Sequence, residues 1–192
     1  MPHSDFLSLL KDVGALREGH FQLASGRHSA HYVQVAQLSQ HPALLQPLLK
    51  GIKPEIDALG QIDSVFFPAI GALPVGQLLG LALEKRAFFA ERNKSNEMEL
   101  RRGFEIKKGE KLLLAEDVIT TGGTLKEIVK MVEAAGAEII GVFCIINRSG
   151  KDTWEGYPLI SLIELTFPTY APGELPPELE EIPVYRPGTK TV

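Results

Sequence analysis

Residues 112–124 have the sequence Leu112-Leu113-Leu114-Ala115-Glu116-Asp117-Val118-Ile119-Thr120-Thr121-Gly122-Gly123-Thr124. The apolar residues 112–115 predict a buried strand, and residues 124–135 have the apolar spacing of an amphipathic helix. Two adjacent acids and a threonine-glycine turn stand between them. In an open α/β sheet, ligands bind beyond the carboxyl ends of the strands. The run therefore predicts a ligand site built on a strand, a turn and a helix.

The acids and the turn offer two complementary kinds of contact. Glu116 and Asp117 can accept hydrogen bonds from two neighbouring hydroxyls, as a ribose presents. The turn from Thr120 to Thr124 supplies amides, hydroxyls, two flexible glycines and the positive end of a helix, which favours a phosphate. The run thus predicts a sugar-phosphate site. The simpler alternative is a strand that ends in two acids, followed by an ordinary turn with Thr124 as the helix N-cap.

The rest of the chain predicts an α/β fold with a mostly parallel sheet flanked by helices. From residue 62 onward, apolar strands alternate with amphipathic helices, which is typical of parallel sheets. The predicted strands are 64–67, 87–90, 112–115, 139–146 and 159–165, and the predicted helices are 42–58, 73–83 and 124–135. The polar residues 91–109 predict a loop or an exposed hairpin, and residues 21–35 a further hairpin.

Length and composition predict one domain. The 192 residues would form a core at 61–165, with residues 1–60 as a small N-terminal hood and the proline-rich residues 166–192 as an irregular tail. The net charge of −4 argues against a general nucleic-acid surface. The single cysteine, Cys144, lies in an apolar run and is expected to be buried. No apolar run of about 18 residues occurs, so a soluble cytoplasmic protein is expected.

Nucleotide-binding loops of other classes do not occur in the sequence. The glycine-lysine pattern of nucleoside triphosphatases and the Gly-x-Gly-x-x-Gly pattern of dinucleotide-binding proteins are both absent. Residues 112–124 instead resemble the phosphoribosyl pyrophosphate motif of the type I phosphoribosyltransferases. Further stretches resemble the orotate phosphoribosyltransferases among them: Phe21–Gln34, Pro68–Ala72, Phe89–Arg92 with Leu100–Phe104, Asn147–Ser149, and Pro183–Gly188.

The resemblance implies an activity, a cofactor and a set of residues. The family transfers the phosphoribosyl group of phosphoribosyl pyrophosphate to orotate, which yields orotidine 5'-monophosphate and pyrophosphate, with Mg²⁺ and as a homodimer. The residues implied to bind phosphoribosyl pyrophosphate are Arg92, Glu116, Asp117, Val118, Ile119, Thr120, Thr121, Gly122, Gly123 and Thr124. Those implied for orotate are Thr120 and Arg148, and those implied for catalysis are Lys94, Arg101 and Asp117.

Several of these residues have a simpler interpretation. Arg101 and Arg102 would otherwise form a solvated loop face, and Arg148 a surface ion pair. Neither His28 nor His31 has a nearby cysteine or carboxylate in the sequence, so no protein metal site is predicted. Trp154 is expected to be a packing residue.

Two other functions remain open at this stage. A phosphoribosyltransferase for a purine or another base would share the sugar-phosphate motif, although an arginine suited to a carboxylate favours orotate. A regulator that senses phosphoribosyl pyrophosphate without turnover would usually carry a DNA-binding segment. No such segment or basic stripe is evident in the sequence.

Overall fold

The computed structural model describes residues 3–23 and 25–187, so the extreme ends of the predicted hood and tail lie outside it. The chain divides into two compact units, one within residues 1–38 and 166–192 and the other comprising residues 39–165. Within the described residues, no helix combines the length and the apolar character needed to span a bilayer.

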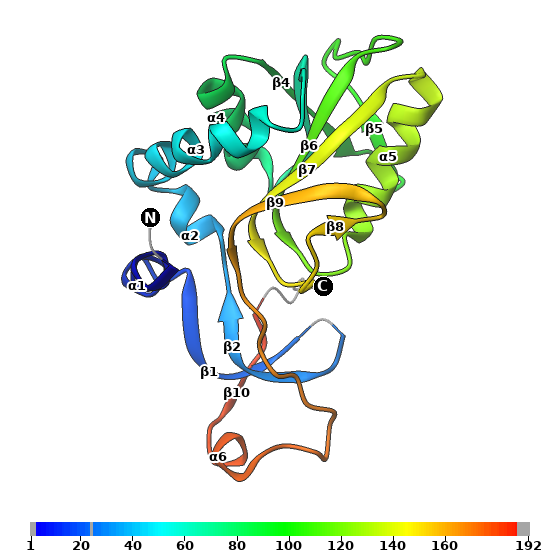
Figure 1. Ribbon diagram of the computed structural model, residues 1–192. Helices are drawn as coiled ribbons and strands as arrows, with labels where there is room; N and C mark the ends of the chain where they lie inside the picture. The colour runs from blue at the N-terminus through cyan, green and yellow to red at the C-terminus, as the bar shows by residue number, and fades with distance from the viewer. Residues whose placement is uncertain (1–2, 24, 188–192) are drawn as a thin grey trace. The chain divides into compact units, whose positions relative to one another are not determined.

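The larger unit is built on a seven-stranded sheet with the order β5-β4-β3-β6-β7-β9-β8 (Figure 1). Its strands are β3 (Ser64–Pro68), β4 (Arg86–Arg92), β5 (Met98–Leu100), β6 (Lys111–Ile119), β7 (Glu138–Asn147), β8 (Thr153–Trp154) and β9 (Tyr157–Glu164). The five central strands are parallel, and β5 and β8 pair antiparallel at the two edges. The predicted mostly parallel α/β fold is therefore confirmed.

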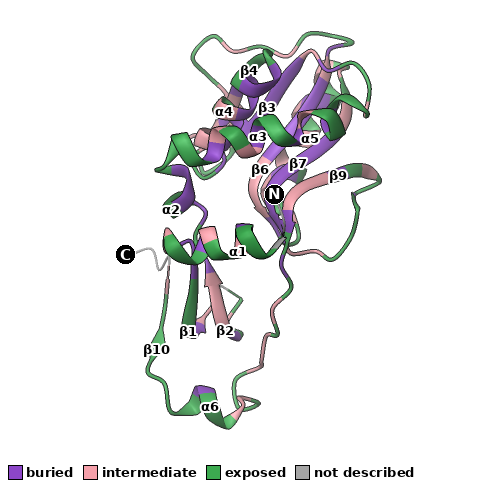
Figure 2. Ribbon diagram, turned by 60° about the vertical axis from the view of Figure 1, so that its left-hand side comes forward, coloured by how far each residue is buried: buried purple, intermediate pink, exposed green. Residues whose placement is uncertain are grey.

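Three long helices flank this sheet: α3 (Pro42–Asp57), α4 (Leu73–Leu83) and α5 (Gly123–Ala135). The β3–α4–β4 and β6–α5–β7 connections run in opposite directions along the sheet. Because such crossovers are right-handed, α4 and α5 cover opposite faces, as Figure 1 shows. The central strands are consequently buried on both sides (Figure 2), and all five residues of β3 are buried.

The α3 helix confirms the predicted helix 42–58, whereas β6 is longer than predicted. The α3 helix continues through Pro47 and Pro54, because a buried face of Leu45, Leu49, Ile52 and Ile56 compensates for the backbone hydrogen bonds that proline removes. Strand β6 extends to Ile119 and not to residue 115, because β7 pairs with it as far as Ile119 and Asn147. Glu116 and Asp117 therefore lie within the strand rather than after it.

The smaller unit contains the predicted hairpin and a partly regular tail. Its elements are α1 (His3–Asp12), β1 (Leu16–Gln22), β2 (His28–Val33), α6 (Pro177–Glu180) and β10 (Val184–Tyr185). The short helix α2 (Ala36–Ser39) spans the boundary to the larger unit, which begins at Ser39. β1 and β2 pair antiparallel, and β10 adds to β1 in parallel. The tail is thus less irregular than predicted, because a distant strand edge is available for pairing.

Two of the three histidines in this hairpin, His20 and His28, contact each other. His28 Nδ1 lies 2.6 Å from His20 Nε2, and both rings are buried. His31 instead stacks on the ring of Phe167. The two histidines that are three residues apart in sequence therefore have different environments.

Candidate active site

The acids Glu116 and Asp117 lie where the sheet opens. Strand β3 pairs with β6 only as far as Leu114, whereas β7 stays paired with it to Ile119. Beyond β3 the chain enters the loop of residues 69–72, which runs beside the acids. This divergence leaves both acids half-buried and not enclosed in the core.

The two carboxylates are tied to the strand's own backbone. Asp117 Oδ1 accepts a hydrogen bond from the Val118 amide at 2.8 Å, and Glu116 Oε1 accepts one from the Asp117 amide at 3.2 Å. Burial, together with the neighbouring charge of Asp117, raises the pKa of Glu116 to about 8. Both causes favour the protonated form of Glu116 in the ligand-free pair.

Gly71 brings the loop after β3 against the acid pair. A β-carbon on Gly71 would lie 3.0 Å from Asp117 Oδ2, which is a tighter approach than side chains normally make. The adjacent Ala69–Ile70 peptide is cis, and the amide of Ala69 donates to the carbonyl of Ala90 at 2.7 Å. Residues 68–72, which resemble a pyrophosphate-side loop, therefore lie directly beside Asp117.

The turn after β6 has the geometry of an anion cradle. Gly122 has left-handed backbone angles (φ 70°, ψ 31°) and is the N-cap of α5. Thr120, Thr121 and Gly123 are exposed. Because glycine has no side chain, the N-cap residue does not cover the first-turn amides of the helix. The alternative with Thr124 as N-cap is wrong, since the helix already begins at Gly123.

Arg148 lies beside this turn, at the carboxyl end of β7. Its amide donates to the carbonyl of Ile119 at 2.8 Å, so its backbone adjoins the residue before Thr120. The arginine is half-buried, and burial lowers the pKa of its guanidinium from the usual value. The buried Asn147 shapes the segment that carries it: its amide group donates to the Lys151 carbonyl and accepts from Ser149.

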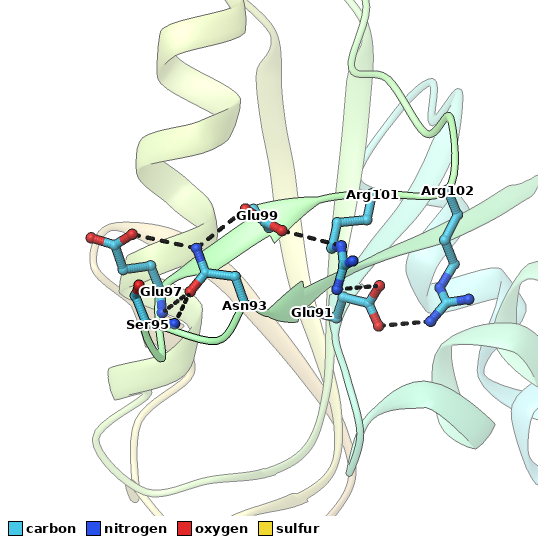
Figure 3. Close-up of polar contacts among 7 residues, drawn as sticks. All are labelled: Glu91, Asn93, Ser95, Glu97, Glu99, Arg101 and Arg102. Carbon is cyan, nitrogen blue, oxygen red and sulfur yellow. Dashed lines mark hydrogen bonds and ion pairs between the residues drawn. The ribbon is translucent and has the colours of Figure 1, made fainter.

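Three of the predicted cations lie in the β4–β5 hairpin and the residues that follow it: Arg92, Lys94 and Arg101. Figure 3 shows Arg101 with the neighbouring Arg102 and the acids around them. Glu91 is held between Arg102 at 3.0 Å and Arg101 at 3.7 Å, and Arg101 Nε also pairs with Glu99 at 3.1 Å. All these ion pairs have at least one exposed partner. The carboxylates of the hairpin therefore neutralise the charges of Arg101 and Arg102 in the single chain.

The hairpin turn is stabilised by Asn93, whose Oδ1 accepts hydrogen bonds from the amides of Ser95 and Glu97 at 2.8 and 3.0 Å (Figure 3). Lys94 is exposed in this turn. Arg92 reaches α5, where its guanidinium makes two hydrogen bonds to Glu127 at 2.7 and 3.1 Å. Arg92 thus ties the hairpin to the helix whose first turn forms the cradle.

The structure brings together only part of the predicted site. Glu116, Asp117, the turn and Arg148 adjoin one another at the carboxyl ends of β6 and β7. The side chain of Ile119 is fully buried, so only its backbone is available to a ligand. Arg92 and Lys94 lie in the β4–β5 hairpin, and Arg101 directly follows it. Both arginines form ion pairs with carboxylates.

Two residues of the site were not singled out from the sequence as functional. Gly71 lies in the stretch Pro68–Ala72 that resembles the family, but its closeness to Asp117 has no local signal, because it depends on how β3 and β6 diverge. Trp154 was expected only to pack, yet its Nε1 donates to the Thr121 carbonyl at 3.2 Å. A buried indole that needs an acceptor was the available signal.

The acid pair would suit a magnesium ion that is bound jointly with substrate phosphates. Among the residues that the structure describes, no group of three histidine, cysteine or acidic side chains is placed to hold a metal. Mg²⁺ commonly keeps several waters and is bound by one or two carboxylates plus substrate phosphates. The half-buried carboxylates of Glu116 and Asp117 match that kind of site.

The comparisons with known proteins agree with this geometry. The family described as "Phosphoribosyl transferase domain" matches residues 35–165. The solved orotate phosphoribosyltransferase of Aeropyrum pernix has a TM-score of 0.67 and 24% identity, with 82% of this chain and 92% of that chain covered. The chain therefore belongs to the type I phosphoribosyltransferases.

Full-length relatives define the family more closely. The chain is 44% identical over 187 residues to the orotate phosphoribosyltransferase of Caldicellulosiruptor saccharolyticus, with 97% of each chain covered. It is 42% identical over 192 residues to that of Novosphingobium aromaticivorans, with 99% of this chain and 98% of that one covered. Within its class, the chain belongs to the orotate phosphoribosyltransferases, and the family predicted from the motifs is confirmed.

Proposed function

We propose that this chain transfers the phosphoribosyl group of phosphoribosyl pyrophosphate to orotate, as a step of pyrimidine biosynthesis. The proposal rests on one observation: the acid pair, the Gly122 turn and Arg148 lie together at one edge of the sheet. Full-length relatives that are named for this activity support the choice of orotate.

Each part of the site suits one part of the reactants. Glu116 and Asp117 would accept hydrogen bonds from the two ribose hydroxyls, and the amides of residues 120–124 would bind the 5'-phosphate. Arg148 would bind the orotate carboxylate through its planar guanidinium. Held in this way, the ring nitrogen of orotate faces C1 of the ribose, and positioning lowers the barrier.

The transfer forms a carbon–nitrogen bond as the bond from C1 to the pyrophosphate oxygen breaks. Positive charge develops at the anomeric centre and negative charge on the leaving group. We assign stabilisation of the leaving group to Lys94 or Arg101, and that of the anomeric centre to Asp117. Bound Mg²⁺ would neutralise charge on the pyrophosphate oxygens.

The proposal extends to the organisation of the protein. A homodimer in which the β4–β5 hairpin acts at the partner's site would account for a hairpin whose arginines are bound to carboxylates in the single chain. We infer a cytoplasmic location and a single catalytic domain, with residues 61–165 as the core, 1–60 as a hood and 166–192 as a tail.

The first prediction is the activity itself. With phosphoribosyl pyrophosphate and Mg²⁺, the purified protein should consume orotate, which is followed by its absorbance, and should leave adenine and hypoxanthine unchanged. Consumption of a purine in place of orotate would overturn the base assignment. Binding of phosphoribosyl pyrophosphate without any turnover would favour the sensing regulator.

Asp117→Asn tests the acid pair within the same assay. Loss of a charged acceptor for a ribose hydroxyl should lower kcat/KM for phosphoribosyl pyrophosphate by about tenfold to a hundredfold. Asp152→Asn is the matched control, because Asp152 is an exposed acid outside the site. Equal kinetics for the two variants would remove the assigned role of Asp117.

A further inference from the structure

Trp154 lies directly behind the phosphate-binding turn. It is the only tryptophan of the chain, lies on β8 and is 5% exposed. Its indole Nε1 donates a hydrogen bond to the carbonyl oxygen of Thr121 at 3.2 Å. A residue from an edge strand thus contacts the backbone of the proposed cradle for the 5'-phosphate.

The indole also sets the shape of the turn sterically. A β-carbon built on Gly122 would lie 2.1 Å from Trp154 Nε1 and 2.5 Å from Cε2. Gly122 has a φ of 70°, a conformation that L side chains rarely adopt. Two independent constraints, the close approach and the left-handed conformation, therefore require glycine at position 122.

The indole is itself fixed by the core. Trp154 pairs with Tyr157 across the β8–β9 hairpin and packs in the cluster that contains Leu125, Ile128 and Leu159. Because Leu125 and Ile128 belong to α5, the same helix carries the turn at its start and the packing surface for the indole. The turn consequently lies on a rigid support.

The hydrogen bond to Thr121 determines the direction of an amide. The peptide that joins Thr121 to Gly122 is trans, so its carbonyl and its N–H point in opposite directions. When Trp154 binds the carbonyl, the Gly122 N–H must point away from the indole. That direction is the side of the turn opposite the core.

We propose that Trp154 is a positioning residue of the phosphate-binding turn, which holds the Thr121–Gly122 peptide so that the Gly122 N–H faces the 5'-phosphate. This inference rests on the proposed function of the turn. Trp154 does not touch the substrate; it acts through the peptide that does. Free rotation of this peptide would remove one donor from the cradle.

Trp154→Phe tests the proposal, because it keeps an aromatic ring and removes the N–H. The KM for phosphoribosyl pyrophosphate should rise about threefold to tenfold, which corresponds to one lost hydrogen bond. The kcat and the KM for orotate should stay within about twofold of the wild-type values. Tyr157→Phe is the matched control, since it removes a hydroxyl from the same hairpin.

Ribose 5-phosphate serves as a probe that needs no turnover. Calorimetric titration should show that Trp154→Phe weakens its binding by a factor similar to the rise in KM, whereas Tyr157→Phe leaves the binding unchanged. If the wild-type protein binds ribose 5-phosphate but transfers nothing to orotate, the proposed function is wrong. The binding measurement still tests the role of Trp154 in that case. Unchanged ribose 5-phosphate affinity in Trp154→Phe would overturn the role of Trp154.

A second replacement covers the case in which Trp154→Phe does not fold. Because the chain has one tryptophan, a benzothiophene analogue with sulfur in place of N–H can replace it uniquely. It preserves the shape of the indole, so a purely packing role predicts wild-type ribose 5-phosphate affinity. The positioning role predicts the same threefold to tenfold weakening, about one hydrogen bond.

Discussion

In the ligand-free chain the raised pKa of Glu116 favours a proton on the Glu116–Asp117 pair, because burial and the adjacent charge disfavour two ionised carboxylates side by side. This state offers a ribose one hydroxyl-like donor and several acceptors. Full ionisation of the pair becomes favourable when a ligand supplies hydroxyl donors or a cation. The pair is therefore suited to a substrate that brings both.

Glu116→Gln should change how stability depends on pH. The pKa of Glu116 is raised from 4.5 to about 8, so the folded state binds more protons than the unfolded state between these values. The contribution of Glu116 to wild-type stability should therefore fall as pH rises from 4.5 to 8. Glutamine cannot lose a proton, so this variant should lack that part of the decline.

Thermal unfolding at several pH values measures this effect. Relative to the wild type, Glu116→Gln should gain about 1 kcal/mol or more between pH 5 and pH 8, which is roughly 2–4 °C in Tm. Glu174→Gln, at an exposed acid, is the control and should parallel the wild type. A Glu116→Gln curve that runs parallel to the wild-type curve would contradict the raised pKa.

Arg148→Ala should impair the use of orotate and leave the sugar phosphate unaffected. A charge-assisted contact to a carboxylate contributes about 1.5–3 kcal/mol, so the KM for orotate should rise about tenfold or more. The KM for phosphoribosyl pyrophosphate should stay within about twofold. Lys151→Ala is the control, because Lys151 is an exposed cation of the same segment. Steady-state kinetics with each substrate varied in turn measure both KM values. An unchanged KM for orotate would contradict the assigned role of Arg148.

At the scale of single elements, the β4–β5 hairpin carries its charges in exposed ion pairs. Glu91 binds both Arg101 and Arg102, and Glu99 binds Arg101 (Figure 3). Exposed ion pairs contribute about 0.2–1 kcal/mol each, so a pyrophosphate with several charges can displace them. The hairpin can therefore exchange its internal carboxylates for a ligand at low energetic cost.

Arg101→Ala should separate catalysis from stability. If Arg101 stabilises the departing pyrophosphate, kcat should fall at least about tenfold. The Tm should fall by no more than about 2–4 °C, because the lost ion pairs are exposed. Arg102→Ala removes a neighbouring arginine that also binds Glu91 and serves as the comparison. Equal kcat values for both variants would assign the role elsewhere, with Lys94 as the next residue to test.

At the scale of the whole molecule, the proposed dimer predicts complementation between two impaired variants. Arg101→Ala removes the hairpin cation and Asp117→Asn the acid, so a mixed dimer would contain one intact site if the hairpin acts across the interface. Random exchange of subunits should restore about a quarter of the wild-type activity. Each variant alone, taken through the same exchange procedure, is the control. No recovery after demonstrated subunit exchange would place the hairpin in its own subunit's site.

Local sequence determined much of this protein. The apolar run before Glu116, the glycine-rich turn and the periodic helix after it predict a strand, a cradle and a helix, because each depends on neighbouring residues. Helices at 73–83 and 42–58 followed from the same periodicity, and the motif identified the family. Only the tertiary structure decided where β6 ends, since that depends on its pairing with β7. Three further contacts likewise depend on strand order and register, which bring together residues that no local pattern connects. They are those of Asp117 with Gly71, of Thr121 with Trp154 and of Glu91 with two arginines.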